Sequence, residues 1–446
     1  MPVPSILIKN IHIVNEGFIV VSDVLFNHGR IEKIAPQINY KASLEIDGTG
    51  KYLMPGIIDD QVHFREPGLT HKASIYSESR AAVAGGVTTF MEMPNTIPNA
   101  LTQELLEQKY QIASRSSLAN YSFFMGVSNE NYDEVMRTST EDVCGIKIFM
   151  GSSTGSMLVD NENTLEKIFA NTGKIVATHC ESEPIIKANL DKALAQYGED
   201  MPTRMHPIIR DEEACYASSS YAIGLAKKHG TRLHVLHIST QEEIALFSNT
   251  LPLEQKKITA EVCVHHLHFS SDDYAPLGNK IKCNPAIKAP HHKPKLLEAL
   301  LNNTFDVVAT DHAPHTLEEK NSTYLKAPSG LPLVQHSLQL MLEFYFDKKI
   351  SLERIVEKMC HAPAQLFGIK DRGFLREGYY ADAFILDLNA TQKISTETIF
   401  YKCGWSPLEG KIMRGLVTDT FVNGNIVYMH GKFDESSNGM RLKFTR

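Results

Sequence analysis

The sequence predicts an α/β fold in which a TIM-like (β/α)8 barrel is joined to a small β-sandwich domain. Between residues 55 and 365, eight short apolar runs alternate with helical patterns, which is typical of parallel strands linked by crossover helices. At both chain ends, apolar and polar residues alternate in short runs broken by turns, which is typical of antiparallel strands. We therefore expect residues 1–54 and 366–446 to form one small β-sandwich domain around the barrel of residues 55–365.

The eight expected barrel strands are rich in β-branched and aromatic residues. They cover residues 56–59, 88–93, 121–125, 145–149, 175–178, 233–236, 258–262 and 306–310. Helical patterns lie between them, for example over 102–115, 212–228 and 294–302. A doubly wound open sheet is the structural alternative, but no G-x-G-x-x-G motif follows the first strand. The eight repeats favour the closed barrel.

Composition narrows the class of protein. The chain has 446 residues, 43% of them hydrophobic and 22% charged, which is ordinary for a globular protein and excludes extensive disorder. Its net charge of −7 gives no basic footprint for nucleic acid. The seven cysteines are dispersed without a Cys-x-x-Cys pair, which argues against a disulfide framework. No apolar run reaches the roughly 20 residues of a membrane span, so we expect a cytoplasmic protein.

Polar and titratable side chains stand at the ends of the expected strands, where a barrel of this kind carries its active site. An imidazole alone is more often structural, but here several occur on separate strand ends together with a lysine and a carboxylate. These nitrogen and oxygen donors suit zinc in a catalytic role. The strand-end residues are Gln61, His63, Arg65, Asn95, Lys147, His179, His237, Cys263, His265, His266 and Asp311.

Several of these residues stand in longer motifs that resemble the amidohydrolase superfamily and, within it, the dihydroorotases. The resemblance runs through the whole chain and includes Gly404-Trp405-Ser406-Pro407 near its end. The motifs are Met54-Pro55-Gly56-Ile57-Ile58-Asp59-Asp60-Gln61-Val62-His63-Phe64-Arg65-Glu66-Pro67-Gly68, Glu92-Met93-Pro94-Asn95-Thr96, Lys147-Ile148-Phe149-Met150-Gly151, His179-Cys180-Glu181, Leu236-His237-Ile238-Ser239-Thr240, Asn284-Pro285-Ala286-Ile287-Lys288 and Thr310-Asp311-His312-Ala313-Pro314-His315.

The resemblance implies a site for two Zn²⁺ ions in which a carboxylated lysine is the bridging ligand. Lys147 matches that lysine, and the apolar residues on both sides of it predict burial. A buried ammonium is costly, whereas carboxylation makes the side chain an anionic ligand. His63, His179 and His237 match further ligands. Asp311 matches a metal-bound aspartate that carries a proton from water to the leaving nitrogen.

Gln61 departs from the family, which usually has His-x-His at the end of the first strand. Gln61 and His63 share one face of the strand, so the geometry for two ligands exists. A glutamine amide oxygen is a much weaker zinc ligand than imidazole, so Gln61 is expected to be a weak or absent ligand. Three outcomes stay open: two metals with a looser outer one, a single buried metal, or a catalytically silent relative.

His234 stands three residues before His237 in the same apolar run. In a strand, a spacing of three places two side chains on opposite faces. We therefore expect His234 to be structural and His237 to face the site.

Substrate contacts also follow from the resemblance. Arg65, Asn95 and His315 match residues that hold the free carboxylate of dihydroorotate, and the planar fork of arginine suits this task. Asn284 matches a residue that contacts the ring, and Ser329 with Gly330 belongs to a loop that lines the site. Ser329 and Lys288 replace the phenylalanine and arginine usual at these positions. Residues 151–156 are expected to form an active-site loop, because they lack the ending of a phosphate-binding P-loop.

The resulting hypothesis is a dihydroorotase, which interconverts N-carbamoyl-L-aspartate and L-dihydroorotate in pyrimidine biosynthesis. Two alternatives stay open: a cyclic amidohydrolase for another ring (hydantoinase, dihydropyrimidinase or allantoinase type), and a non-catalytic scaffold, suggested by Gln61. A homodimer is expected by analogy with relatives. The resemblance also raises association with aspartate carbamoyltransferase.

Overall fold

The computed structural model describes residues 4–151 and 157–445, and its middle part forms the predicted barrel. Parallel pairing links the strands in chain order, with β8 and β9 forming one strand interrupted at Phe124. The His63 amide donates to the His312 carbonyl at 2.7 Å and closes the ring between the first and last strands. The barrel strands are β6 (Ile57–Val62), β7 (Val87–Glu92), β8 (Asn120–Phe123), β9 (Met125–Gly126), β10 (Ile146–Phe149), β11 (Val176–His179), β12 (Leu233–Val235), β13 (Ile258–Cys263) and β14 (Val307–Ala309).

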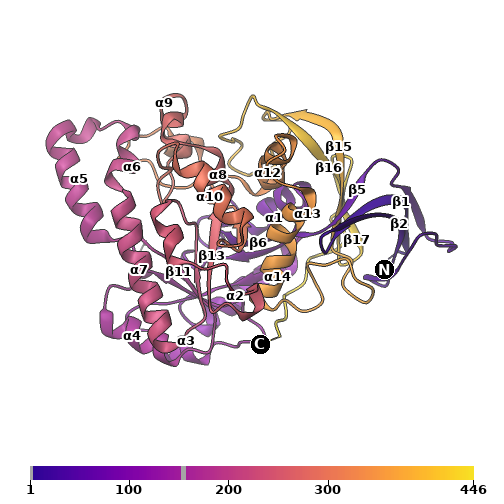
Figure 1. Cartoon of the computed structure of the whole chain (residues 1–446), viewed down its shortest axis with the longest axis horizontal. Helices are drawn as coiled ribbons and strands as arrows, with labels where there is room; N and C mark the ends of the chain where they lie inside the picture. The colour runs from indigo at the N-terminus through magenta and orange to yellow at the C-terminus, as the bar shows by residue number, and fades with distance from the viewer. Residues whose placement is uncertain (1–3, 152–156, 446) are drawn as a thin grey trace.

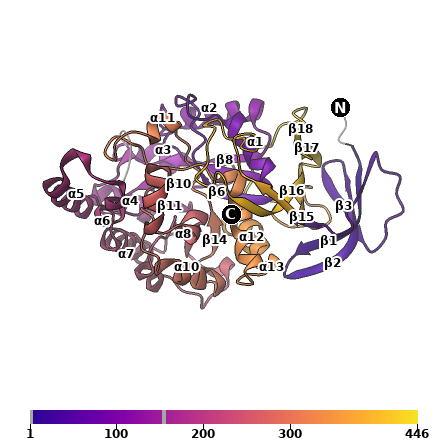
Figure 2. The same ribbon diagram turned by 90° about the horizontal axis from the view of Figure 1, so that it is seen from above.

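Helices surround the barrel in both views (Figures 1 and 2). They begin and end where the sequence supplies caps: the Thr102 hydroxyl accepts from the Leu105 amide at the start of α2, and Gly230 ends α7 with φ 70°. None of the helices in the described parts of the chain combines the length and apolar character that a membrane crossing requires. The longer helices are α1 (Ile75–Ala84), α2 (Gln103–Ser116), α4 (Glu162–Asn171), α5 (Glu183–Tyr197), α7 (Glu212–His229), α10 (His292–Leu301) and α12 (Ser337–Phe346); the shorter ones are α3 (Tyr132–Arg137), α6 (His206–Ile209), α8 (Val264–His268), α9 (Tyr274–Leu277), α11 (Leu317–Lys320), α13 (Leu352–Val356) and α14 (Ala362–Phe367).

Both chain ends build one sheet beside the barrel, as predicted (Figures 1 and 2). The two ends meet where β5 pairs antiparallel with β15, so that Leu53 lies opposite Ile385. Ile6, Phe26 and Phe421 pack in the core of this sheet domain. Its strand order is β18-β17-β16-β15-β5-β1-β2-β3, with β4 beside β1. The strands are β1 (Ile6–Asn15), β2 (Phe18–Asn27), β3 (Arg30–Ala35), β4 (Leu44–Asp47), β5 (Tyr52–Pro55), β15 (Ala383–Lys393), β16 (Ile412–Val422), β17 (Asn425–Met429) and β18 (Lys432–Phe433).

Three further expectations concern details of the chain. The seven cysteines are all free, and six of them are buried. The domain limits at residues 54, 55, 365 and 366 stay predictions. The loop expected over residues 151–156 lies, apart from Gly151, outside the described residues.

Candidate active site

One cavity of about 500 Å³ opens at the C-terminal ends of the barrel strands. We call the residues that line it the mouth. Every residue predicted to hold metal or substrate lines this cavity, although the residues come from segments spread over 270 positions of the sequence. They are Gln61, His63, Arg65, Asn95, Lys147, His179, His237, Asn284, Asp311, His315, Ser329 and Gly330.

Three mouth residues have left-handed backbone conformations within three residues after a strand end. Arg65 has φ 71°, His237 φ 40° and Asp311 φ 46°. Such conformations cost about 1–3 kcal/mol each for residues other than glycine and persist where the surrounding fold imposes them. They follow β6, β12 and β14, and all three side chains line the same cavity.

His179 and His237 form the inner pair of imidazoles. His179 Nδ1 lies 2.9 Å from His237 Nε2, and His179 Nε2 donates to Glu181 Oε2 at 2.9 Å. Arg210 Nη1 donates to the same Glu181 oxygen at 2.6 Å. Burial opposes the charge of Glu181, but Arg210 and His179 hold the pKa of its carboxyl well below the ordinary value. Glu181 therefore fixes the His179 tautomer whose Nδ1 presents a lone pair to the cavity.

Sequence reasoning assigned no role to Glu181, although the motif His179-Cys180-Glu181 contains it. The signal was a carboxylate two residues after an expected ligand, which is the usual partner for the second nitrogen of a metal-binding imidazole.

His63 and Asp311 form the outer part of the mouth. His63 Nδ1 donates to Asn95 Oδ1 at 2.7 Å, and its Nε2 lies 3.0 Å from Asp311 Oδ1. Gln61 Nε2 donates to the same Asp311 oxygen at 3.1 Å. An amide NH₂ group has no lone pair for a metal. In this orientation Gln61 supplies a hydrogen bond to Asp311 in place of a ligand.

Lys147 lies on β10 between these two groups and is 1% exposed. Burial lowers the pKa of its amine to about 8, against the opposing charges of Asp311 and Glu261. Two imidazoles with their second nitrogens on acceptors, a buried amine and a carboxylate are a donor set that fits a divalent metal ion. The residues that can hold the ion are His63, Lys147, His179, His237 and Asp311.

Arg65 and His315 form the side of the mouth away from the imidazole pair. Lys72 Nζ donates to His315 Nδ1 at 3.0 Å, so His315 Nε2 carries the proton and donates to the Ser329 carbonyl at 3.0 Å. Arg65 Nε donates to the Pro314 carbonyl, and its Nη2 lies 3.0 Å from His315 Nε2. Burial lowers the pKa of the Arg65 guanidinium to about 10, and it remains charged at neutral pH. No sequence pattern pointed to the Lys72 contact.

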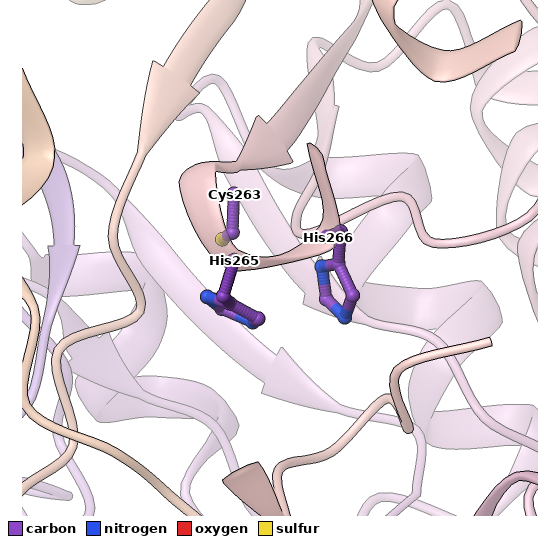
Figure 3. A group of neighbouring side chains, drawn as sticks. All are labelled: Cys263, His265 and His266. Atoms are coloured by element: carbon purple, nitrogen blue, oxygen red, sulfur yellow. The ribbon is translucent and has the colours of Figure 1, made fainter. Parts of the chain in front are cut away.

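Cys263, His265 and His266 are also neighbours, as Figure 3 shows, but none of them lines the cavity. His266 Nε2 donates to the Pro285 carbonyl at 3.1 Å, and the Cys263 thiol lies 3.3 Å from Glu261 Oε1. These strand-end residues therefore lie behind the mouth.

His234 does not lie on the opposite face from His237, in contrast to the expectation. β12 ends at Val235 and His237 has a positive φ, so strand alternation does not extend across the pair. His234 lies inside the barrel, where its Nε2 is 3.1 Å from Asp60 Oδ2 of β6.

Comparisons with known proteins identify the family of the chain. The model of the amidohydrolase family matches residues 52–427. A dihydroorotase from Methanosarcina acetivorans is 33% identical over 96% of this chain and 92% of its own length. An allantoinase from Deinococcus radiodurans is 30% identical over 93% of each chain. The solved L-hydantoinase (dihydropyrimidinase) from Arthrobacter aurescens superposes with a TM-score of 0.90 at 28% identity, covering 96% of this chain and 97% of that one.

Proposed function

This chain belongs to the amidohydrolase family and is a cyclic amidohydrolase, and we propose that the ring it opens is that of L-dihydroorotate. The product is N-carbamoyl-L-aspartate, and the reverse reaction closes the ring in pyrimidine biosynthesis. Relatives named dihydroorotase, allantoinase and L-hydantoinase match the chain at similar identity, so overall similarity does not select the ring. The selection has to come from the residues that contact the substrate.

Arg65 is the observation that carries the proposal. Its guanidinium is buried, lines the cavity and forms no salt bridge with any residue of 4–151 or 157–445. A buried cation without an ion-pair partner is costly and favours an anionic ligand. Dihydroorotate carries a carboxylate, whereas hydantoin, dihydrouracil and allantoin do not.

The substrate carboxylate would be held by Arg65 and its neighbours. Because His315 donates its proton to the Ser329 carbonyl, Arg65 Nη2 keeps its hydrogens for the substrate. A bidentate contact from a guanidinium also fixes the orientation of the ring. Asn95 borders this region, although its Oδ1 is occupied by His63. Asn284 lines the cavity and is proposed to contact the ring.

A divalent ion, proposed to be Zn²⁺, would be held by His179, His237 and Lys147, with His63 and Asp311 on the outer side. When bound, such an ion supplies Lewis-acid polarisation of the ring carbonyl and acidifies water. Lys147 would serve as a carboxylated ligand: its neutral amine forms an N–C bond to CO₂ and releases one proton. Burial, which lowers the pKa of this amine, makes the neutral form accessible near neutral pH.

Asp311 is the residue proposed to move the proton. It is held by His63 and Gln61 at one oxygen, and although burial opposes its charge, His63 keeps the pKa of its carboxyl below the ordinary value. Asp311 is thus ionised and can accept a proton from the attacking water. As the carbonyl carbon–nitrogen bond breaks, Asp311 returns that proton to the leaving ring nitrogen.

Turnover and one matched pair of variants test the proposal. We expect the zinc- and bicarbonate-loaded protein to hydrolyse L-dihydroorotate in preference to hydantoin, dihydrouracil and allantoin. Arg65→Gln should lower kcat/KM for dihydroorotate by about 100-fold, through loss of a charged hydrogen-bond pair, and spare any activity on neutral rings. Arg115→Gln, at an exposed helical position, is the control.

Other outcomes identify the alternatives. Faster turnover of a neutral ring would assign the chain to a hydantoinase, dihydropyrimidinase or allantoinase activity. No turnover of any ring by folded, metal-loaded protein would leave the non-catalytic scaffold. A cytoplasmic homodimer, and association with aspartate carbamoyltransferase, belong to the same proposal.

A further inference from the structure

A second group of buried titratable side chains lies inside the barrel, behind the mouth. It consists of Asp60 on β6, His234 on β12 and Glu261 on β13, which we call the inner cluster. One ligand atom from each lies within 4.8 Å of the other two, and all three side chains are 0% exposed. None of the three lines the catalytic cavity. Since β6 and β12 are not adjacent in the barrel, their side chains meet across its interior.

None of the facing atoms of the inner cluster has a hydrogen-bond partner outside the cluster within the described chain. This holds for both oxygens of Asp60, for Glu261 Oε2 and for His234 Nε2. Inside the cluster, His234 Nε2 lies 3.1 Å from Asp60 Oδ2 and 3.8 Å from Glu261 Oε2. The other His234 nitrogen, Nδ1, contacts Thr259 Oγ1 at 2.9 Å, so Nε2 is the atom directed at the carboxylates. More than nine in ten buried polar atoms normally have a hydrogen-bond partner, so several such atoms facing one point need an explanation.

Charge points to a cation as that explanation. Asp60 and Glu261 are two carboxylates, and Asp59 beside them is a third buried one, which the Thr310 hydroxyl contacts at 2.6 Å. His234 can supply at most one positive charge. Over residues 4–151 and 157–445, no lysine or arginine forms an ion pair with Asp60 or Glu261. His234 pairs with both carboxylates and so compensates one negative charge; each further charge left without a partner costs several kcal/mol in a protein interior.

We propose that the inner cluster binds a divalent first-row metal ion, separate from the ion of the mouth. One imidazole and two carboxylates are ligands that Zn²⁺ and Mn²⁺ accept. Bonds of about 2.0–2.2 Å place neighbouring donors of a tetrahedral ion about 3.4 Å apart. His234 Nε2 lies 3.1 Å from Asp60 Oδ2 and 3.8 Å from Glu261 Oε2, which brackets that spacing.

The ion would support the mouth through Glu261. Glu261 Oε1, the oxygen outside the cluster, accepts from the His237 backbone amide at 2.9 Å and contacts the Cys263 thiol at 3.3 Å. A metal bond at Oε2 would hold this carboxylate in place. It would thereby hold the strained backbone at His237, which points a metal-binding imidazole into the cavity. The role is structural, and it does not depend on which ring the enzyme opens.

Anomalous diffraction from the full-length protein tests the proposal directly. Crystals of metal-free protein are equilibrated with Mn²⁺ or with Zn²⁺ and measured on both sides of the absorption edge. We expect a peak between Asp60, His234 and Glu261 in addition to density at the mouth. An occupied mouth with no peak at the inner cluster, for both ions, would overturn the proposal and leave a shared proton as the compensating charge.

Metal stoichiometry of matched variants gives an independent measurement. Asp60→Asn keeps the side-chain shape and removes one anionic ligand, so it should lose one equivalent of tightly bound metal per chain. Asp306→Asn removes another buried carboxylate, one paired with Lys256, and should lose none. His237→Ala should lose metal from the mouth and retain the inner equivalent. Full metal content in folded Asp60→Asn would contradict the proposal; if that variant does not fold, the diffraction experiment on the wild-type protein decides.

Discussion

The mouth and the inner cluster are both built from buried imidazoles and carboxylates on barrel strands, yet their hydrogen bonding differs. In the mouth, His63 and His179 each place one nitrogen on an acceptor, Asn95 and Glu181, and direct the other into the cavity. In the inner cluster, the nitrogen and oxygens that face one another have no hydrogen-bond partner outside the cluster in the described chain. The comparison shows two ways to prepare a metal site: one fixes the ligands in advance, and the other depends on the ion to hold them.

Cationic groups mark a second difference. Lys147 and Arg65 line the mouth, whereas in the described chain no lysine or arginine forms an ion pair with Asp60 or Glu261, although the charge of Glu261 acts on Lys147. The mouth can therefore admit a charged substrate and change its state of protonation. None of the three residues of the inner cluster lines the cavity, which suits a fixed ion.

The largest expected effect is the loss of kcat when Asp311, the proposed proton carrier of the mouth, is replaced. Asp311→Asn keeps the size of the side chain and removes its ability to accept a proton. Because general acid–base catalysis typically contributes about 10²–10⁴-fold, we expect kcat for ring opening to fall by about 10³-fold or more. The thermal midpoint of unfolding should change little compared with this loss. A variant that retains near-normal kcat would remove Asp311 from the proton-transfer role.

A smaller effect should follow from breaking the pre-organised contact of His179. Glu181→Gln leaves a neutral acceptor opposite His179 Nε2 and removes the anion that also pairs with Arg210. Loss of such partners typically weakens metal binding by about 10–100-fold. Competition with a chelator should show this weakening for the mouth ion, and no change for an ion of the inner cluster. Equal weakening at both sites would mean that the two regions are not independent.

The sequence predicted the mouth well because its residues occupy equivalent positions. Lys147 lies within β10, His179 ends β11 and Asp311 follows β14, and the barrel brings the C-terminal parts of its strands together. The contacts that were not predicted join segments whose proximity does not follow from the order of the strands. Lys72, for example, reaches His315 from the loop after β6.

The inner cluster could not be predicted for a related reason. Its members come from strands that meet only when the barrel closes and when the local register is known. The expectation for His234 failed because it assumed that the strand continues as far as His237, whereas the chain turns there into a left-handed conformation. In contrast, the pairing of both chain ends in one sheet followed from their alternating patterns, and β5 beside β15 confirms it.

An imidazole at position 61 should increase the affinity of the mouth for metal and leave the inner cluster unchanged. Gln61 now donates its amide hydrogen to Asp311, so the outer position lacks one ligand. Gln61→His would place a second imidazole on the face that His63 uses, and we expect the affinity for the outermost ion to rise by about tenfold. Titration of metal-free protein with Zn²⁺, followed calorimetrically, measures this change. An unchanged titration would show that Gln61 does not limit binding at the outer position.

The smallest expected effect concerns the pH at which Lys147 reacts with CO₂. Burial lowers the pKa of this amine to about 8, so its neutral form, which is the nucleophile, increases as pH rises through that value. At a constant concentration of dissolved CO₂, the rate of ¹³C-carbamate formation in metal-free protein should rise about fivefold from pH 7 to pH 8 and level off above pH 9. An exposed lysine, with a pKa near 10.5, would instead give a tenfold rise per pH unit over the whole range.

The ¹³C resonance of the carbamate distinguishes the two profiles, and Lys147→Arg, which cannot be carboxylated, should show no such signal. A rate that keeps rising beyond pH 9 would mean that burial does not activate Lys147. The mouth and the inner cluster would then differ only in the hydrogen bonds of their side chains, and no longer in the reactivity of a buried amine.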